Sequence, residues 1–557
     1  MSTLLPGTSN LGRYREIAAV LARHGFGWLV AGLGLRDLVP FSQRLGRAEE
    51  PEKVTQPARL RLAFEELGTA FIKVGQLLST RPDLLPPDYI AELSRLQDAT
   101  PPAPYVQVAV VLEAELGAAP EKVFAAFDES PLASASIGQV HAARLHSGEE
   151  VVVKVQRLGV AAAVERDLDV LTEIAGLAED HTAFGSDYDA TGLADEFAFT
   201  LRSELMYTRE GQNADRFREA FSGEPGFYVP HVYWDYTTDR VIVQERLRGV
   251  KADNLAALES AGVDRKKLAA DTVRLTLEQM FLHGFFHADP HPGNFFVLED
   301  GSIGMMDFGM IGYLDDPLQE SLTRLFMALF KGDTERMMDE LLAMGVSRTR
   351  VNRIALKRDL DHMIILYKNS SAKELEAAHI FEEMTGLARR HRLGLPSDLL
   401  LMARVMAMSE GLGTRLDPDF QFVPFATPYF KRFWLAKRSP EKIKERMAEG
   451  VAEMADLGMA LPRHLRRFMT QAERGQLGAR VELGDMDRFL SVIQAMVNRL
   501  AVSILVGSLI VGLSLFLHMF APETSSDYAG WFFGVSFIGA VFFGLWLLFG
   551  LLRSGRR

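Results

Sequence analysis

Cysteine is absent from the 557 residues of this chain. The absence excludes disulfide bonds, zinc sites built on thiolates and cysteine nucleophiles. An excess of basic residues is absent too, since the formal net charge is −12, and this argues against a general nucleic-acid-binding protein. The N-terminus lacks the pattern of a signal peptide, because its apolar stretch from Trp28 to Leu35 is short and has no Ala-x-Ala cleavage site.

Two long uncharged runs stand near the C-terminus, from Leu500 to Ala521 and from Trp531 to Leu552. Each is close to the roughly 20 residues that cross a bilayer as a helix. Arg499 precedes the first run and Arg553 follows the second. Because positive residues that flank spans stay on the cytoplasmic side, we predict a transmembrane helical hairpin over 499–552. We therefore expect a multi-pass protein of the inner membrane whose main domain faces the cytoplasm.

The order of strand-like and helix-like patterns predicts the fold class. Residues 57–80 have helical periodicity, whereas 149–155 and 240–245 are short β-branched runs. After residue 260 the pattern is helical apart from the turn-rich stretch 284–312. A small sheet followed by helices is typical of a two-lobed, kinase-like α+β fold. We expect five segments: an N-terminal helical segment 1–50, a helical extension 51–118, a kinase-like N-lobe 119–250, a mostly helical C-lobe with juxtamembrane helices 251–495, and the hairpin 499–552.

Two motifs carry the strongest functional signal, His287-Ala-Asp-Pro-His-Pro-Gly-Asn294 and Met305-Met-Asp-Phe-Gly309. In protein kinases the catalytic-loop Asp precedes a metal-binding Asn by five positions, and a later Asp-Phe-Gly supplies a second metal ligand. Asp289 precedes Asn294 by five positions here, and Asp307 follows after a predicted strand and turn. The spacing predicts an ATP site in which Asn294 and Asp307 hold Mg²⁺ and Asp289 orients the acceptor.

Zinc binding is the alternative for the first motif, through His287 and His291. A third and fourth ligand at a suggestive spacing are missing. The prolines and glycine between the histidines suit a rigid loop better than a metal site.

Lys154 ends the run Val-Val-Val-Lys, and a small-residue turn within Ala133–His141 precedes it. In kinases such a lysine binds the α and β phosphates and needs a carboxylate partner on a following helix. Glu204 and Glu210 lie on that predicted helix, and sequence spacing leaves open which of them pairs with Lys154. Two further carboxylates are rivals for the pairing, Glu165 and Asp167. Glu245 falls where the hinge that binds adenine is expected.

The chain resembles the UbiB family of atypical kinases, which includes the AarF and mitochondrial coenzyme-Q kinase-like proteins. The most specific marker is Phe71-Ile-Lys-Val-Gly-Gln76, which matches the family's Lys-x-Gly-Gln motif. The Ala/Ser-rich stretch Ala133–His141 in place of a glycine-rich loop and the His-x-Asp-Pro-His-Pro-Gly-Asn loop match as well. The resemblance covers roughly 55–315 strongly, and the predicted hairpin is similar to the bacterial branch.

The resemblance implies that the helix with Lys73 and Gln76 folds across the active site, where a protein substrate would otherwise dock. One departure is Met206, because the family usually has Asp at this position, and it leaves the coupling between that helix and the nucleotide site open. Ser134 stands where Ala is commoner and adds a hydroxyl near the phosphates. The expected residues of the ATP site outside the two motifs are Ala133, Ser134, Ala135, Ser136, Lys154, Glu245, Lys73 and Gln76, with Glu204 as the catalytic carboxylate beside Asp289 and Lys154.

Family members are linked to ATP hydrolysis and ubiquinone biosynthesis. We therefore expect an ATP- and Mg²⁺-dependent accessory enzyme that acts on membrane lipid or polyprenylated quinone precursors, in contact with other ubiquinone-synthesis proteins and without nucleic acid. The sequence leaves open whether the protein forms a homodimer. Two alternatives remain, a protein or small-molecule kinase, and a non-catalytic ATP-gated scaffold for lipid extraction or complex assembly.

Overall fold

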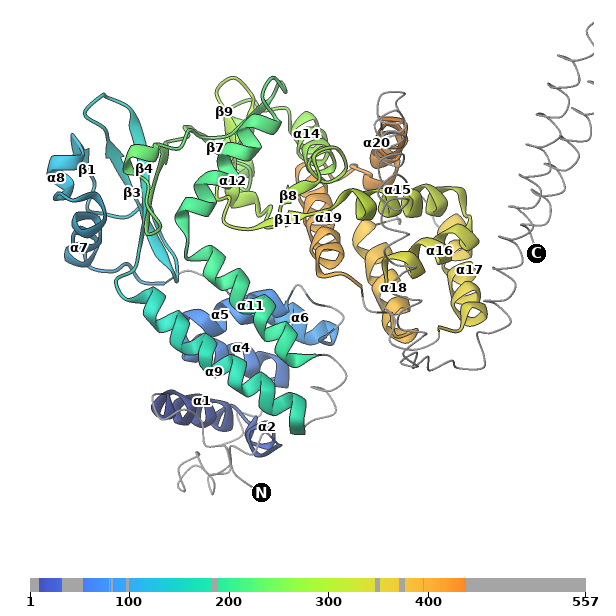
Figure 1. The fold of residues 1–557 in the computed structure, drawn as a ribbon. Helices are drawn as coiled ribbons and strands as arrows, with labels where there is room; N and C mark the ends of the chain where they lie inside the picture. The colour runs from blue at the N-terminus through green and yellow to red at the C-terminus, as the bar shows by residue number, and fades with distance from the viewer. Residues whose placement is uncertain are drawn as a thin grey trace, which may run out of the picture. The chain divides into compact units, whose positions relative to one another are not determined.

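The chain divides into two units, Met1–Lys442 and Ile443–Arg557, and Figure 1 shows the elements of the first. The computed structural model describes residues 10–32, 54–79, 81, 84–96, 100–181, 189–345, 351–369, 376–393 and 395–436, all within the first unit. The predicted hairpin at 499–552 and the juxtamembrane residues 437–495 lie outside the described residues. In the part of the chain that the structure describes, no helix is both long and apolar enough to cross a membrane.

The described residues of the N-terminal region are mainly helical. Its helices are α1 (Leu11–Arg23), α2 (Gly27–Gly32), α4 (Gln56–Leu67), α5 (Thr69–Leu78) and α6 (Pro87–Leu93). The periodic stretch 57–80 forms two helices and not one, because Gly68 between them has φ +96°. That conformation is open to glycine and closed to most other residues. The break turns α5 away from the line of α4 and lets Phe64 pack on Phe71 with ring centroids 5.9 Å apart.

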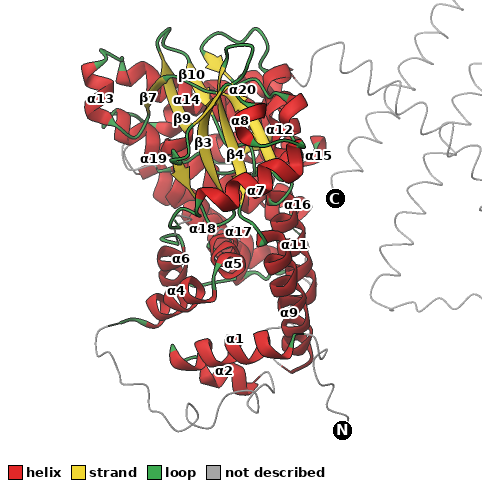
Figure 2. Cartoon of the chain, turned by 90° about the vertical axis from the view of Figure 1, so that its left-hand side faces the viewer, coloured by secondary structure: helices red, strands yellow, loops and turns green. Residues whose placement is uncertain are grey.

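An antiparallel sheet forms the first lobe. Its strands are β1 (Ala126–Phe127), β2 (Ala133–Ser134), β3 (Gly138–Arg144), β4 (Glu150–Gln156) and β6 (Val241–Glu245), in the order β1-β3-β4-β6 with β2 on β3. The valines of β4 and β6 pack on one face against α7 (Tyr105–Leu116), which Figure 2 shows across the strands. α7 therefore belongs to the core of this sheet, although the predicted lobe begins only at residue 119. The short helix α8 (Pro120–Val123) links α7 to β1.

The other face of the sheet carries Lys154. Lys154 pairs with Ile242 in register, and Val152 pairs with Gln244. Residues directly opposite in an antiparallel pair point to the same face, so these four side chains face away from α7. Two long helices follow β4, α9 (Val160–His181) and α11 (Ala190–Glu204), which lie beside α5 in Figure 1. After a two-residue break, Leu205 and Met206, comes α12 (Tyr207–Ala220).

The second lobe begins with small sheets and continues as helices. A four-stranded sheet has the order β5 (Phe227–Tyr228), β10 (Ile303–Met305), β9 (Phe295–Leu298) and β7 (Gly249–Lys251), and β8 (Phe285–His287) pairs with β11 (Ile311–Tyr313). The helices are α13 (Leu255–Ser260), α14 (Arg265–Glu278), α15 (Asp316–Lys331), α16 (Thr334–Met344), α17 (Arg353–Asn369), α18 (Ala377–Arg390), α19 (Ser397–Leu416) and α20 (Phe422–Ala436). The sheet-then-helix order of an α+β fold is confirmed.

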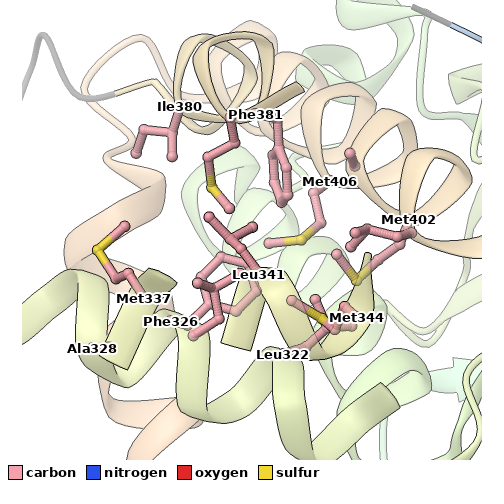
Figure 3. Close-up of a cluster of buried hydrophobic side chains, with 14 of the residues drawn as sticks. Leu322, Phe326, Ala328, Met337, Leu341, Met344, Ile380, Phe381, Met402 and Met406 are labelled. Carbon is pink, nitrogen blue, oxygen red and sulfur yellow. The ribbon is translucent and has the colours of Figure 1, made fainter. Parts of the chain in front are cut away.

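Methionine fills much of the helical core of this lobe. Figure 3 shows Met337, Met344, Met402 and Met406 around Phe326, with side chains from α15, α16, α18 and α19. Unbranched thioether side chains fill irregular gaps between helices. This core holds α19 close to β11, and β11 is paired with the strand that leads into the first functional motif.

Candidate active site

Three charged side chains from three separate elements meet at one point. Lys154 lies on β4, Glu210 on α12, and Asp307 two residues after β10. The Nζ atom of Lys154 is 2.8 Å from Oε2 of Glu210 and 3.6 Å from Oδ1 of Asp307. The Glu210 side chain is 5% exposed and that of Asp307 53%. The cluster of three side chains is therefore anchored in the interior at Glu210 and reaches solvent at Asp307.

The charges of this cluster hold each other in place. Lys154 lowers the pKa of Asp307, against an opposing effect of burial. Burial disfavours the charged form of Lys154, but the carboxylates of Asp307 and Glu210 outweigh it and raise the pKa of this lysine well above its ordinary value. At neutral pH Lys154 is therefore a cation and Asp307 an anion, as a phosphate-binding lysine and a metal-binding carboxylate must be.

The backbone at Asp307 has φ +61°. This conformation is uncommon for a residue other than glycine and is stabilised only by its surroundings. Phe308 supplies that support, because it is fully buried with its ring centroid 5.1 Å from that of Phe217 on α12. Nδ2 of Asn213, also on α12, donates to the Phe308 carbonyl at 3.0 Å. The helix that carries Glu210 thus also fixes the Asp-Phe-Gly turn.

His287 joins the two motifs. Its Nε2–H donates to the Asp307 carbonyl at 2.6 Å, and its Nδ1 accepts from the Asp289 N–H at 3.2 Å. The Gln279 side chain accepts from the His287 N–H at 3.1 Å, and the ring is 1% exposed. These contacts use both ring nitrogens, so His287 positions backbone and does not bind zinc. Among the described residues no group of three or more His, Asp or Glu side chains is arranged to hold a metal ion on its own.

Asn294 lies next to Asp307, as the predicted strand–turn–strand requires. β9 and β10 are antiparallel with Phe295 opposite Met305, and the Met306 N–H donates to the Asn294 carbonyl at 2.9 Å. Nδ2 of Asn294 donates to the Asp289 carbonyl at 3.1 Å. The remaining amide oxygen of Asn294 and the half-exposed carboxylate of Asp307 form a hard oxygen donor set. Mg²⁺ prefers such ligands together with phosphate oxygens, so these residues fit the ion.

The helix with the Lys-x-Gly-Gln motif is α5, and its lysine reaches the same cluster. Nζ of Lys73 is 2.8 Å from Oε2 of Glu204, and both side chains are largely buried, at 13% and 10% exposed. The charge of Lys73 also contributes, after Lys154 and His287, to the lowered pKa of Asp307. Gln76 points away, since its Nε2 donates to the Leu96 carbonyl at 3.1 Å. Gln76 therefore supports the extension, while Lys73 faces the site.

The assignment of Glu204 as the catalytic carboxylate beside Lys154 is corrected by these contacts. Glu204 ends α11 and pairs with Lys73, whereas Glu210, one turn into α12, pairs with Lys154. The rivals Glu165 and Asp167 bind Arg202 and Arg13. Met206 is 40% exposed at the start of α12. Although position 206 is not an aspartate, Lys73 has an acidic partner in Glu204, and this pair links α5 to the site.

Glu245 is not placed as an adenine-binding carboxylate. It ends β6, and its side chain accepts from the Tyr228 hydroxyl at 2.7 Å and from the His231 N–H at 3.2 Å. These partners hold the carboxylate on the side of β5.

Two residues near the site carry no motif in the sequence. Gln244 lies on the Lys154 face of the sheet, is buried, and its Nε2 has no hydrogen-bond partner among the described residues. Arg404 on α19 lies within electrostatic reach of Asp289, because burial lowers the pKa of this arginine and the Asp289 charge opposes that effect. Sequence reasoning missed Arg404 because more than a hundred residues separate it from the catalytic loop. Gln244 could have been found from the sequence, because alternate residues of the strand that begins Val241-Ile-Val point to the same face of the sheet.

The Ala/Ser-rich stretch forms a tight turn between β2 and β3. Ala133 and Ser134 make up β2, and the Ala135 N–H donates to the Gly138 carbonyl at 2.8 Å. The Ser136 carbonyl accepts from the Thr69 hydroxyl of α5 at 3.4 Å. The turn thus lies between the Lys154 strand and the N-terminus of α5, where a phosphate loop is expected.

The chain matches three family models, the ABC1 atypical kinase-like domain over 95–341, the UbiB helical domain over 360–421 and the ABC1/UbiB kinase-like C-terminal domain over 484–553. A probable protein kinase UbiB of Xanthomonas axonopodis pv. citri is 33% identical over 540 residues, which cover 94% of this chain and 95% of the relative. The chloroplastic protein ACTIVITY OF BC1 COMPLEX KINASE 7 of Arabidopsis thaliana is 35% identical over 77% of this chain and 63% of its own.

Among solved structures, a Mycobacterium tuberculosis protein in complex with erythromycin is 27% identical and covers 65% of this chain and 92% of its own, with a TM-score of 0.47. That score is too low to support an argument about the fold. The sequence relatives extend over nearly the whole chain, and the family models include both the kinase-like site and the helices after it. The chain therefore belongs to the ABC1/UbiB family of atypical kinase-like proteins.

Proposed function

We propose that this protein binds MgATP and hydrolyses it as an accessory factor of ubiquinone biosynthesis at the inner membrane. The observation that carries the proposal is the cluster of Lys154, Glu210 and Asp307 beside Asn294 and Asp289. A lysine held by a helix carboxylate, with two metal ligands next to it, is the arrangement that phosphoryl transfer from ATP requires.

Each residue has a definite role in this proposal. Lys154 binds the α and β phosphates, and Glu210 holds its ammonium group in place. Asn294 and Asp307 would hold Mg²⁺, which would supply positive charge next to the phosphates. Asp289 orients the attacking water, and His287 keeps Asp289 and Asp307 in a fixed relation through its two ring nitrogens.

Coverage of the site favours water or a small acceptor over a protein acceptor. Lys73 on α5 forms a largely buried pair at the edge of the nucleotide site. In this proposal α5 covers the approach to Asp289, so a protein chain would have to displace it. Relatives are named as probable protein kinases, so protein phosphorylation remains the second candidate.

The quinone and membrane parts of the proposal rest on other support. Relatives that cover nearly the whole chain carry the name UbiB, and one family match spans 484–553, where the two uncharged runs lie. Polyprenylated quinone precursors partition into the bilayer, because each buried methylene group contributes about 0.8 kcal/mol. A membrane hairpin would bring the ATP site to them.

ATP hydrolysis by purified full-length protein in detergent tests the activity. We expect Asp289→Asn and Asp307→Asn to lower kcat at least about a hundredfold, the scale of lost general-base or electrostatic assistance. Asp300→Asn, at the nearby β9–β10 turn, is the matched control and should keep the parent rate. Equal hydrolysis by all four proteins would refute the assignment.

A deletion strain separates the pathway proposal from the scaffold alternative. Quinone profiling after complementation with Asp307→Asn should show no restored ubiquinone. Restoration by a variant that binds ATP but does not hydrolyse it would favour the scaffold instead. Labelled ATP incubated with a membrane extract distinguishes the kinase alternative, since stable phosphate on an acceptor supports a kinase and free phosphate supports the ATPase.

A further inference from the structure

Arg157 follows β4 directly and contacts the phosphate-loop turn from both its side chain and its backbone. Its Nε donates to the Ala135 carbonyl at 2.9 Å, and its Nη2 donates to the Ser134 hydroxyl at 2.8 Å. Its backbone N–H donates to the Ile137 carbonyl at 2.9 Å. A single residue thus holds the turn at three positions, Ser134, Ala135 and Ile137.

The same guanidinium group contacts the segment that leads from the N-terminal extension into the sheet. Nη2 of Arg157 donates to the Pro101 carbonyl at 2.6 Å. Two residues further on, the Ala103 N–H donates to the side chain of Gln139 on β3 at 2.8 Å. Arg157 therefore joins the phosphate-loop turn, the sheet and this connecting segment.

The partners of Arg157 are neutral oxygens, and in the described part of the chain no carboxylate pairs with it. Burial lowers the pKa of its guanidinium group. The hydrogen bonds to these oxygens replace water around a partly desolvated cation. The planar fork of arginine reaches several oxygens at once, which a lysine ammonium does not do.

We propose that Arg157 is a positioning residue that clamps the phosphate loop in its nucleotide-binding conformation and thereby sets the affinity for nucleotide. This inference rests on the proposed function of the site. A loop that is held before binding loses less conformational entropy when nucleotide binds. Ala and Ser in place of glycine reduce the number of backbone conformations that the turn can adopt. Arg157 then stabilises one of these conformations.

Ser134 supplies a side-chain contact of the clamp. Its hydroxyl, which the sequence analysis placed near the phosphates, accepts from Arg157 instead. An alanine at this position, as is commoner in the family, cannot make that hydrogen bond. The effect of Ser134 on nucleotide binding should therefore depend on Arg157.

The experiment measures the Kd of MgATP and MgADP by calorimetry, and the KM and kcat of ATP hydrolysis, on the full-length protein in detergent. The variants are Arg157→Met, Arg157→Lys, Ser134→Ala and the double variant Ser134→Ala/Arg157→Met. Arg144→Met is the matched control, because Arg144 also lies on this sheet but does not contact the turn. Its side chain is 58% exposed, and its Nη2 makes a long ion pair of 3.8 Å with Oε1 of Glu150. Melting without nucleotide reports the fold of each protein.

We expect Arg157→Met to weaken MgATP binding about tenfold, as the loss of one or two net hydrogen bonds predicts. KM should rise with little change in kcat. Arg157→Lys should bind as weakly as Arg157→Met, since a point charge does not replace the fork. Ser134→Ala should weaken binding about threefold in the parent and not at all in the Arg157→Met background.

Unchanged Kd and KM in Arg157→Met together with a lower melting temperature would show a purely structural role and overturn the inference. Full affinity in Arg157→Lys would overturn it as well, because charge alone would then suffice. If Arg157→Met fails to fold, Ser134→Ala decides, and parent-like affinity contradicts the clamp. A parent that binds no nucleotide refutes the proposed function itself, and the clamp falls with it.

Discussion

At the residue scale, the site depends on which carboxylate meets which lysine. Lys154, Asp289, Asn294 and Asp307 could be named from the sequence, because fixed spacing within short motifs determines their relation. The partner of Lys154 could not, since Glu204 and Glu210 lie on two helices separated by a break at Met206. The structure pairs them with different lysines. Pairing across elements is a property of packing and leaves no local pattern.

Substitution of these two glutamates should have different effects. Glu210→Gln removes the buried partner of Lys154 and should lower kcat/KM for ATP at least about tenfold, equivalent to about 1.4 kcal/mol of lost positioning. Glu204→Gln frees Lys73 and should mainly accelerate hydrogen exchange of the α5 amides. Steady-state kinetics and hydrogen-exchange mass spectrometry on both variants check this. A larger kinetic loss in Glu204→Gln would reverse the assignment.

The lowered pKa of Asp307 predicts a pH dependence of stability. Because its pKa in the folded state lies below the ordinary 3.8, the ionised carboxylate stabilises the fold above about pH 4, and this contribution is lost as the pH falls through the folded-state value. Asp307→Asn also tolerates positive φ but has no charge. The melting temperature of the parent should therefore exceed that of Asp307→Asn by a constant margin from pH 8 to 5, and the margin should shrink below pH 4.

Lys154→Met is the control for this titration. Lys154 is the largest cause of the shift, so in its absence the pKa of Asp307 should rise and the margin should close at a higher pH. The same acid dependence in both backgrounds would mean that Lys154 does not set the charge of Asp307.

At the element scale, α5 is the feature that the sequence predicted only in part. The periodicity of 57–80 and the Lys-x-Gly-Gln motif predict a helix near the site. The break at Gly68 is not visible in the apolar pattern, because the pattern continues on both sides. The short helix that results is held at Gly75, where an added Cβ would lie 2.3 Å from Leu96 Cδ1 and 2.7 Å from Phe64 Cδ2.

Gly75→Ala should therefore loosen the extension. The methyl group would overpack the contact of α5 with Phe64 and Leu96, which lowers the free energy of unfolding by about 1–3 kcal/mol. Gly176→Ala on α9 is the matched control, since nothing lies within 4 Å of its added Cβ, and it should stabilise the protein by about 0.5–1 kcal/mol. Chemical denaturation of both variants measures the difference. Equal free energies of unfolding for the two variants would show that Leu96 and Phe64 accommodate the added methyl group without loss of stability.

At the scale of the whole molecule, the sequence predicts the order of the parts well. The sheet, the two motifs and the later helices follow each other as expected, because strand and helix periods differ along the chain. The position of Arg404 on α19, where the charge of Asp289 acts on it, was not predictable. It depends on how the methionine-rich helices of the second lobe pack.

The predicted hairpin at 499–552 can be tested in a bacterial host. The full-length chain should stay in the membrane fraction after an alkaline carbonate wash. The substitutions Ile510→Lys and Phe542→Lys should weaken that retention, since each charge at the centre of a span raises the free energy of membrane insertion by about 2.5–3.5 kcal/mol. An epitope tag after Arg557 should survive protease added outside spheroplasts. Cleavage of the tag in intact spheroplasts would place the C-terminus on the wrong side for this topology.

If α5 covers the site as proposed, the largely buried pair of Lys73 and Glu204 also limits how often the site can open. Separation of such a pair leaves an uncompensated charge in the interior, at a cost of about 3–5 kcal/mol. At equilibrium, α5 would then be displaced in only about one molecule in a few hundred to a few thousand. An acceptor that needs α5 displaced would meet a competent enzyme rarely, whereas water and a small head group would meet one at almost every encounter. Under the proposed function, acceptor size would thus be set by how often α5 is displaced and not by a recognition contact.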